Sequence, residues 1–130
     1  MVFPNFALGI DPKMGLLKQK IADIENEYGI FSKDLYFPLV SMANRQIEEK
    51  LYTDAVATLK RAQSLSHRHK GVLNIDQIDI INKLTELAII RADFKDANRH
   101  QKFAFFLRKK EARDPENIVG AYLGMAEWLA

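Results

Sequence analysis

The chain has no cysteine among its 130 residues, which excludes a disulfide framework and any metal site built on thiolates. No stretch approaches the roughly 18 consecutive apolar residues of a membrane-spanning helix, so we expect no membrane association. The net charge is only +2 at neutral pH, too small to argue for nucleic acid as the main partner. With 48% hydrophobic and 28% charged residues, the composition is that of a folded, soluble protein.

Signatures of catalysis and of cofactor binding are equally scarce. The sequence has no Gly-x-Ser-x-Gly nucleophile elbow, no phosphate-binding loop and no dinucleotide fingerprint. His67 and His69 stand two residues apart, which on a helix turns them about 200° from each other, so they could not share a metal ion. His100 is isolated in the sequence and is predicted to be solvated. We therefore expect a protein that is not an enzyme and that carries no cofactor or metal.

The first ten residues, Met1 to Ile10, are apolar but have no basic start and are interrupted by Pro4 and Gly9. A secretory signal peptide needs a basic start and an uninterrupted apolar core, so this segment is a poor match. It could instead pack against the first helix. The missing signal favours the cytoplasm, whereas a processed fragment could equally be exported, and the compartment stays open.

A short pattern recurs after 42 residues. An aromatic residue, one spacer and then Asp-Ala occur at Tyr52 to Ala55 and again at Phe94 to Ala97. The same offset places apolar residues on apolar residues: Leu39 on Ile81, Met42 on Leu84, Ile47 on Ile89, Ala62 on Ala104 and Leu65 on Leu107. Apolar positions that keep their register at a fixed period are typical of stacked copies of one supersecondary unit.

Capping residues and apolar spacing predict helices over about 11–28, 35–49, 54–70, 76–91, 94–113 and 114–130. Asp11-Pro12 and Asp114-Pro115 each place a capping carboxylate before a proline at the first helical position. The expected organisation is one helical-repeat domain, 1–130, with a leading helix at 11–31, repeats at 32–71 and 76–113, and an incomplete repeat or capping helix at 114–130.

The apolar stripes of these helices give the expected core. The first helix is expected to bury Leu16, Leu17, Ile21, Ile24 and Tyr28. The next two are expected to bury Leu35, Leu39, Met42, Ala43 and either Gln46 or Ile47, then Ala55, Val56, Leu59, Ala62 and Leu65. The following pair is expected to bury Ile80, Ile81, Leu84, Leu87 and Ala88, then Ala97, Ala104, Phe105 and either Leu107 or Arg108. The small residues Ala55, Ala62, Ala97 and Ala104 are predicted to lie where two helices approach closely.

The last helix is predicted to have no partner within the chain. It would then expose Tyr122, Met125 and Leu129, an apolar stripe of the kind that soluble proteins usually cover. Either the chain is a fragment of a longer array, or this helix and its Trp128 pack against a second molecule.

The helix alternation, the aromatic-x-Asp-Ala signature and the stretch from Leu84 to Ala97 resemble tetratricopeptide repeats. The usual repeat has about 34 residues, and a 42-residue period is similar to the longer form found in kinesin light chains. Four positions depart from the family pattern: Thr85 replaces a small residue, Lys50 and Ala92 replace glycine, and Gln101 replaces an aromatic. The resemblance covers roughly residues 32–130 and implies an all-α fold, a right-handed superhelical stack of antiparallel helix pairs.

The resemblance also implies a concave groove, lined by the first helix of each pair, that holds a peptide or partner protein. The groove positions projected onto this chain are Phe37, Val40, Asn44 and Ile47 in one pair and Asp79, Asn82, Glu86 and Ile89 in the next. Apolar side chains such as Phe37 would anchor the partner. The amides of Asn44 and Asn82 could bond its main chain. Asp79 and Glu86 favour a partner with at least one Lys or Arg.

Two further readings stay open: a self-assembling structural module, which could form homo-oligomers through the terminal helix, and an RNA-binding helical-repeat protein. Residues 91–113 hold eight Lys or Arg against three acids. Cations near helix C-termini offset the macrodipole. Alternatively they could bind an acidic peptide or a nucleic-acid backbone. Phe103, Phe105 and Phe106 among them are either core residues or stacking platforms for bases.

Overall fold

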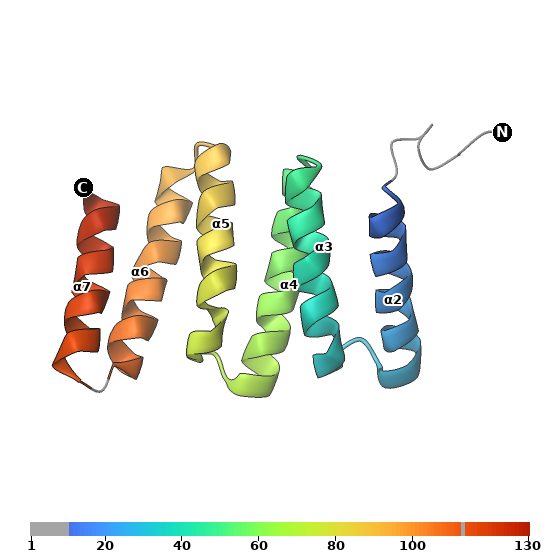
Figure 1. The fold of residues 1–130 in the computed structure, drawn as a ribbon, viewed down its shortest axis with the longest axis horizontal. Helices are drawn as coiled ribbons and strands as arrows, with labels where there is room; N and C mark the ends of the chain where they lie inside the picture. The colour runs from blue at the N-terminus through green and yellow to red at the C-terminus, as the bar shows by residue number, and fades with distance from the viewer. Residues whose placement is uncertain (1–10, 113) are drawn as a thin grey trace. The chain divides into compact units, whose positions relative to one another are not determined.

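The computed structural model describes residues 11–112 and 114–130, and these residues form an all-α fold (Figure 1). Its six helices pack as sequential antiparallel pairs, and the described ranges contain no strand. The helices are α2 (Pro12–Tyr28), α3 (Tyr36–Glu48), α4 (Tyr52–Lys70), α5 (Ile78–Ile90), α6 (Phe94–Glu111) and α7 (Pro115–Leu129). Short 3-10 turns, η1 (Lys33–Leu35) and η2 (Ile75–Gln77), precede α3 and α5. The prediction that residues 1–10 pack on the first helix falls outside the described residues.

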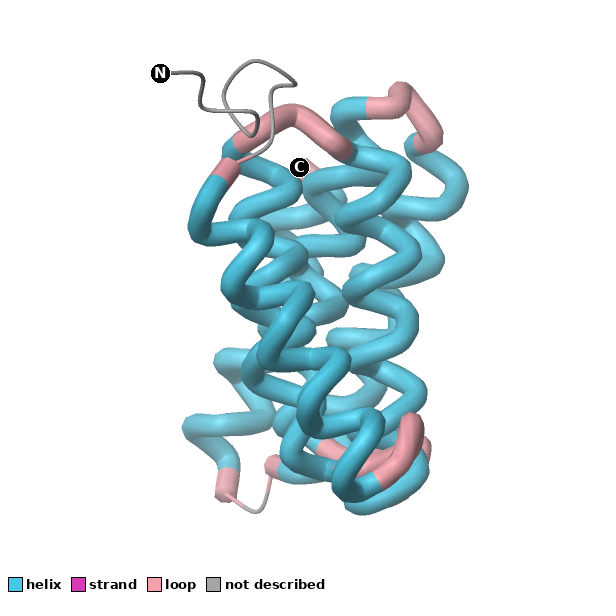
Figure 2. The backbone as a smooth tube through the Cα atoms, turned by 90° about the vertical axis from the view of Figure 1, so that its right-hand side faces the viewer, coloured by secondary structure: helices cyan, strands magenta, loops and turns pink. Residues whose placement is uncertain are grey.

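The chain divides into two compact units, Met1–Leu65 and Ser66–Ala130, with the boundary inside α4. Within the first unit α2 packs on α3, and within the second α5 packs on α6 and α6 on α7. Figure 2 shows how little of the described chain lies outside helices. The core positions predicted for the four helices from α3 to α6 are buried, apart from Phe105, which is half-buried.

Capping residues start α2 and α7 and glycines end α2 and α4 as the sequence predicts, whereas α4 begins at Tyr52, two residues before the expected Asp54. The carboxylate of Asp11 accepts a hydrogen bond from the Lys13 amide, and that of Asp114 accepts one from the Asn117 amide. Asp11 also pairs with Arg45 of α3, which ties the start of α2 to its neighbour and lowers the pKa of this carboxyl. Gly29 ends α2 at a φ of 95°, a backbone conformation that glycine adopts without steric cost.

The 42-residue period of the sequence reappears in the backbone. The turns η1 and η2, the helices α3 and α5, and the starts of α4 and α6 are each displaced by 42 residues. Gly29 and Gly71, also 42 apart, have φ values of 95° and 94°. Each unit therefore contains the same local sequence of glycine turn, 3-10 turn, helix, tight turn and helix.

The tight turn inside each repeat is a Schellman motif. After α3 the Leu51 amide donates to the Gln46 carbonyl at 2.8 Å and the Lys50 amide to the Ile47 carbonyl at 3.0 Å. After α5 the corresponding bonds run from Asp93 to Ala88 at 2.8 Å and from Ala92 to Ile89 at 2.9 Å. Lys50 and Ala92 occupy the left-handed position, with φ of 61° and 59°. These are the two positions at which the repeat family has glycine.

Three expectations for the outer helices are wrong. Leu16 and Tyr28 of α2 are 73% and 61% exposed, and Met14 is buried in their place, because α2 has a neighbouring helix in its unit on one side only. The last helix does have a partner: α7 packs along α6, where the Phe105 and Tyr122 rings meet edge to face with centroids 5.1 Å apart. Of the three residues expected to be exposed on α7, Tyr122 and Leu129 are 50% and 68% exposed, whereas Met125 is half-buried.

The close approach of α3 and α4 predicts that Ala55→Leu destabilises the protein. Ala55 is fully buried, and extra methylene groups there force the packed side chains apart. We expect a loss of roughly 1–3 kcal/mol in the free energy of unfolding, measured by urea denaturation. Ala57→Leu, at an exposed position of the same helix, is the control and should change stability by less than about 0.5 kcal/mol. Equal losses in the two variants would contradict this account of the packing.

The left-handed turn predicts that Ala92→Gly stabilises the protein. Left-handed backbone costs an L-residue about 1–2 kcal/mol, and glycine loses about 0.5–1 kcal/mol in conformational entropy, so a gain of roughly 0.5–1 kcal/mol remains. Thermal and urea unfolding would measure it. Ala57→Gly, in the exposed interior of α4, should instead lose about 1 kcal/mol. A destabilised Ala92→Gly variant would show that the left-handed turn carries no strain.

Candidate functional site

The four groove residues predicted in the first unit lie on one side of α3. Phe37, Val40, Asn44 and Ile47 follow one another at intervals of three or four residues, the spacing of a single helix face. The side chain of Phe37 is 77% exposed, Asn44 is exposed, and Val40 and Ile47 are half-buried. The Phe37 ring meets the Tyr36 ring edge to face at 5.3 Å, which restricts its orientation. This face is apolar, with one amide.

The four groove residues predicted in the second unit lie on the corresponding side of α5. Asp79, Asn82, Glu86 and Ile89 stand 42 residues after those of α3. Asp79 and Glu86 are exposed, Ile89 is 41% exposed and Asn82 is half-buried. The structure thus gathers each set of four on one face of its own helix, and the common groove stays a prediction. The second face is acidic where the first is apolar.

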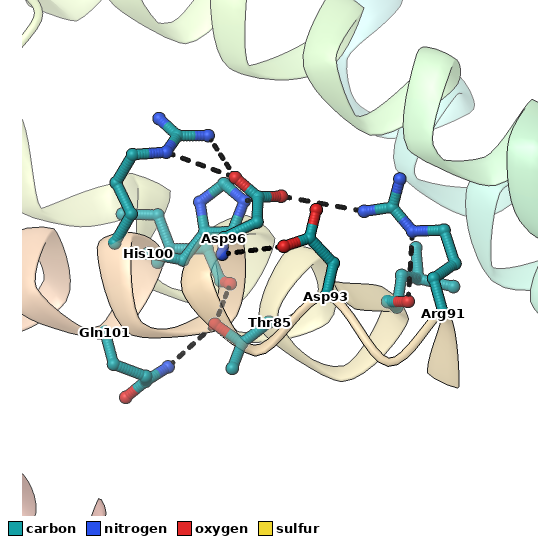
Figure 3. A network of polar contacts seen from close by, with 9 residues as sticks. Thr85, Arg91, Asp93, Asp96, His100 and Gln101 are labelled. Atoms are coloured by element: carbon teal, nitrogen blue, oxygen red, sulfur yellow. Dashed lines mark hydrogen bonds and ion pairs between the residues drawn. The ribbon is translucent and has the colours of Figure 1, made fainter. Parts of the chain in front are cut away.

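A polar cluster between α5 and α6 distinguishes the second repeat from the first. Gln101 of α6 donates from Nε2 to the Thr85 hydroxyl at 2.9 Å and to Asn82 Oδ1 at 3.2 Å. The Thr85 hydroxyl donates in turn to the Ile81 carbonyl at 2.9 Å (Figure 3). The equivalent residues of the first repeat are Ala43, Leu59 and Val40.

Thr85 and Gln101, two positions at which the sequence differs from the tetratricopeptide pattern that it resembles, are hydrogen-bonded partners. The contact also changes what Asn82 can offer a ligand. Its amide oxygen already accepts a hydrogen bond from Gln101, which leaves one lone pair of that oxygen and the two amide N–H donors for a ligand. Asn44 on α3 is exposed.

A second network surrounds Asp96 at the start of α6 (Figure 3). Asp96 accepts from Arg99 at 2.5 and 3.1 Å, lies 3.3 Å from the imidazole of His100, and lies 3.6 Å from the guanidinium of Arg91. Its own amide donates to the Asp93 carboxylate at 3.1 Å. The hydrogen bond from Arg99 lowers the pKa of Asp96, against the opposing effect of partial burial. The network joins the end of α5 to the start of α6.

Two of the histidines, His67 and His100, make contacts that were not predicted from the sequence. His100 is buried beside Asp96 rather than isolated and solvated, and its spacing of four residues from Asp96 was a signal available in the sequence. His67 shares a 2.8 Å hydrogen bond with Gln77 in η2, and Gln77 donates to the Val72 carbonyl at 2.7 Å. These contacts brace the loop between α4 and α5.

Among residues 11–112 and 114–130, no group of three or more His, Asp or Glu side chains is placed to hold a metal ion. No helix in the same ranges is both long enough and apolar enough to cross a membrane. Neither the family models nor the curated proteins with which the chain was compared match it.

A row of cations runs along the exposed side of α6. Its members are Lys95, Arg99, Lys102, Lys109 and Lys110, with Phe106, 48% exposed, among them. Neutralisation of the helix macrodipole explains Lys109 and Lys110 in the last turns. It does not explain the other three, which lie in the first half of the 18-residue helix, where positive charge gains nothing from the dipole.

The Asp96 network predicts a pH-dependent loss of stability in Asp96→Asn. Because folding lowers the pKa of Asp96, its contribution is complete above the ordinary value of 3.8 and is lost as the pH falls through the lower, folded-state value. Unfolding measured from pH 7 to pH 2 should therefore show the variant less stable at neutral pH, with the difference closing in acid. Glu86→Gln, exposed on α5, is the control. If the difference in unfolding free energy between the wild type and Asp96→Asn does not change with pH, the lowered pKa of Asp96 is contradicted.

Proposed function

We propose that the chain is a non-catalytic helical-repeat scaffold that binds a segment of a partner protein on the outer faces of α3 and α5. The supporting observation is the 42-residue repetition of the backbone, since each repeat presents the same face of its first helix to solvent. In this proposal the repeats continue one another as a right-handed superhelical stack of the tetratricopeptide type. Such stacks offer extended surfaces whose curvature follows from the rotation between repeats.

The chemistry of the two faces defines the partner. Phe37 exposes most of a ring whose orientation is already restricted, so burying it costs little side-chain entropy. It would contribute most of the binding free energy, with Val40 and Ile47 beside it. Asp79 and Glu86 supply negative charge on α5, which fits Lys or Arg in the bound segment. The partner segment is therefore apolar at one end and basic at the other.

The proposal predicts that Phe37 is an anchor for the partner. Photo-crosslinking through an unnatural benzophenone side chain at position 37 should capture a discrete set of proteins from a native extract. The same group at position 16 should not capture them, although Leu16 is equally exposed, because α2 lies outside the proposed surface. Phe37→Ala should weaken binding of the captured partner at least tenfold, as loss of about 2 kcal/mol at an anchor does. Leu16→Ala should leave the affinity unchanged.

Peptide arrays test the charge preference of the same surface. Peptides that combine apolar residues with Lys or Arg should bind the wild-type chain and bind Asp79→Asn/Glu86→Gln more weakly. A preference for acidic peptides that survives this double substitution would count against the proposal. Equal capture through positions 16 and 37 would count against it independently of peptide charge.

A further inference from the structure

Three lysines of α6 have no acidic partner among the described residues, unlike Arg99 of the same helix, which pairs with Asp96. Arg45, Arg61 and Lys70 each pair with a carboxylate. By contrast, Lys95, Lys102 and Lys110 form no ion pair with any residue of the described ranges. Lys95, Lys102 and Lys109 are spaced by seven residues, which is close to two turns, so they form a straight row about 21 Å long. We call these three residues the lysine row.

An apolar row lies beside the lysine row, on α7. Ile118, Tyr122, Met125 and Leu129 follow one another at intervals of four, three and four residues and so share one side of the helix. Leu129 is 68% exposed, Tyr122 50% and Ile118 38%. α7 and its N-cap carry no Lys or Arg. The acids of α7, Glu116 and Glu127, lie about 120–140° around the helix from Tyr122. The apolar row is therefore free of charge along its length.

One contact fixes the two rows on the same side of the α6–α7 pair. The ammonium of Lys109 lies 5.4 Å from the Tyr122 ring centroid and 6.0 Å from that of Phe105. Near the other end of the pair, Trp128 Nε1 donates to the Asn98 side chain at 2.7 Å. Figure 1 shows that α6 and α7 lie side by side and antiparallel. With Lys109 beside Tyr122 and Asn98 bonded to Trp128, the two rows therefore run alongside each other toward Lys102 and Leu129. A hollow of about 770 Å³ borders the start of α6. Its lining combines cations and an aromatic ring with two acids and an amide: Lys95, Arg99, Lys102, Phe94, Asp93, Asp96 and Asn98.

We propose that the lysine row and the apolar row together bind an acidic amphipathic helix of a partner protein. Such a helix would carry a line of Asp or Glu against α6 and an adjacent line of apolar side chains against α7. The length of the lysine row corresponds to about 14 residues of helix. This surface lies on helices other than α3 and α5, so the inference goes beyond the function proposed above and does not depend on it.

The uncharged row on α7 argues for a protein helix rather than a nucleic acid. Proteins that hold single strands offer open aromatic faces on which bases stack. Here the Tyr122 and Phe105 rings meet edge to face beside the Lys109 ammonium, and the indole of Trp128 is hydrogen-bonded, whereas Phe94 and Phe106 are exposed. A polyanion would also lay phosphates on the uncharged α7 row, where nothing neutralises them.

Charge argues against a second copy of this chain as the occupant. Two α6–α7 faces brought together would oppose two lysine rows. The acids of α7 lie on a different side of the helix from the apolar row and could not neutralise them. An amphipathic helix with its own acids meets both rows without this conflict.

The test uses the full chain and a fluorescein-labelled, 18-residue helical peptide with one line of Glu beside one line of Leu. Binding is followed by fluorescence anisotropy at low salt. We expect Lys95→Glu/Lys102→Glu to weaken binding at least tenfold and Leu129→Ser to weaken it several-fold. Lys18→Glu/Lys60→Glu makes the same charge change at exposed positions of α2 and α4 and should bind like the wild type. Circular dichroism and thermal unfolding verify that each variant folds. If Lys95→Glu/Lys102→Glu does not fold, Lys95→Gln/Lys102→Gln takes its place in the binding measurements.

A charge-swapped peptide, with Lys in place of Glu, separates recognition from loss of structure. It should bind Lys95→Glu/Lys102→Glu more tightly than it binds the wild type. Three results would overturn the proposal: equal binding of a scrambled peptide of the same composition, tighter binding of an oligouridylate of equal charge, or peptide affinity unchanged by the lysine substitutions. Sedimentation provides a further test. A wild-type dimer that Leu129→Ser converts to a monomer would also overturn the proposal, because it would assign the apolar row to a second copy of the chain. Phe37→Ala should leave this peptide's binding unchanged, so failure here is distinct from failure of the α3–α5 surface.

Discussion

A chain reversal within three residues is the constraint on which the arrangement of each repeat depends. The turn after α3 and the turn after α5 both place a residue in the left-handed conformation, and the next helix begins two residues later. So short a connection brings the two helices of a pair close together from the start, and only small side chains such as Ala55 and Ala97 fit there. The larger side chains Leu39 and Leu84 of the first helices are buried, whereas Phe37 and Ile89, on a different side of the same helices, are exposed.

Most of the fold could be predicted from the sequence because its signals are local. Asp-Pro starts, glycine stops and a fixed 42-residue offset each act over a few residues, and the buried stripes of α3 to α6 follow from helical spacing. The contact of α7 with α6 was missed because α7 is apolar on nearly every side, so its sequence does not distinguish a packed face from an open one. Leu16 was misplaced for a related reason: an apolar residue at helical spacing is buried only where a neighbouring helix covers it.

The candidate surfaces could be predicted only in part, because their chemistry depends on residues distant in sequence. Helical spacing was enough to place the four α3 residues on one face and the four α5 residues on another. It could not show that Gln101, nineteen residues after Asn82, holds its amide oxygen. The seven-residue spacing of the lysine row was visible in the sequence. Its position beside the apolar residues of α7 became apparent only through the contact of Lys109 with Tyr122.

The hydrogen bonds among Thr85, Gln101 and Asn82 also give the two repeats different responses to temperature. Apolar burial raises the heat capacity of unfolding and weakens on cooling, whereas polar groups contribute to the heat capacity with the opposite sign. The first repeat has Ala43, Leu59 and Val40 at these positions and relies on apolar burial there. This contact therefore contributes less to the heat capacity of unfolding in the second repeat than in the first. Its stabilising effect consequently persists to lower temperature in the second repeat.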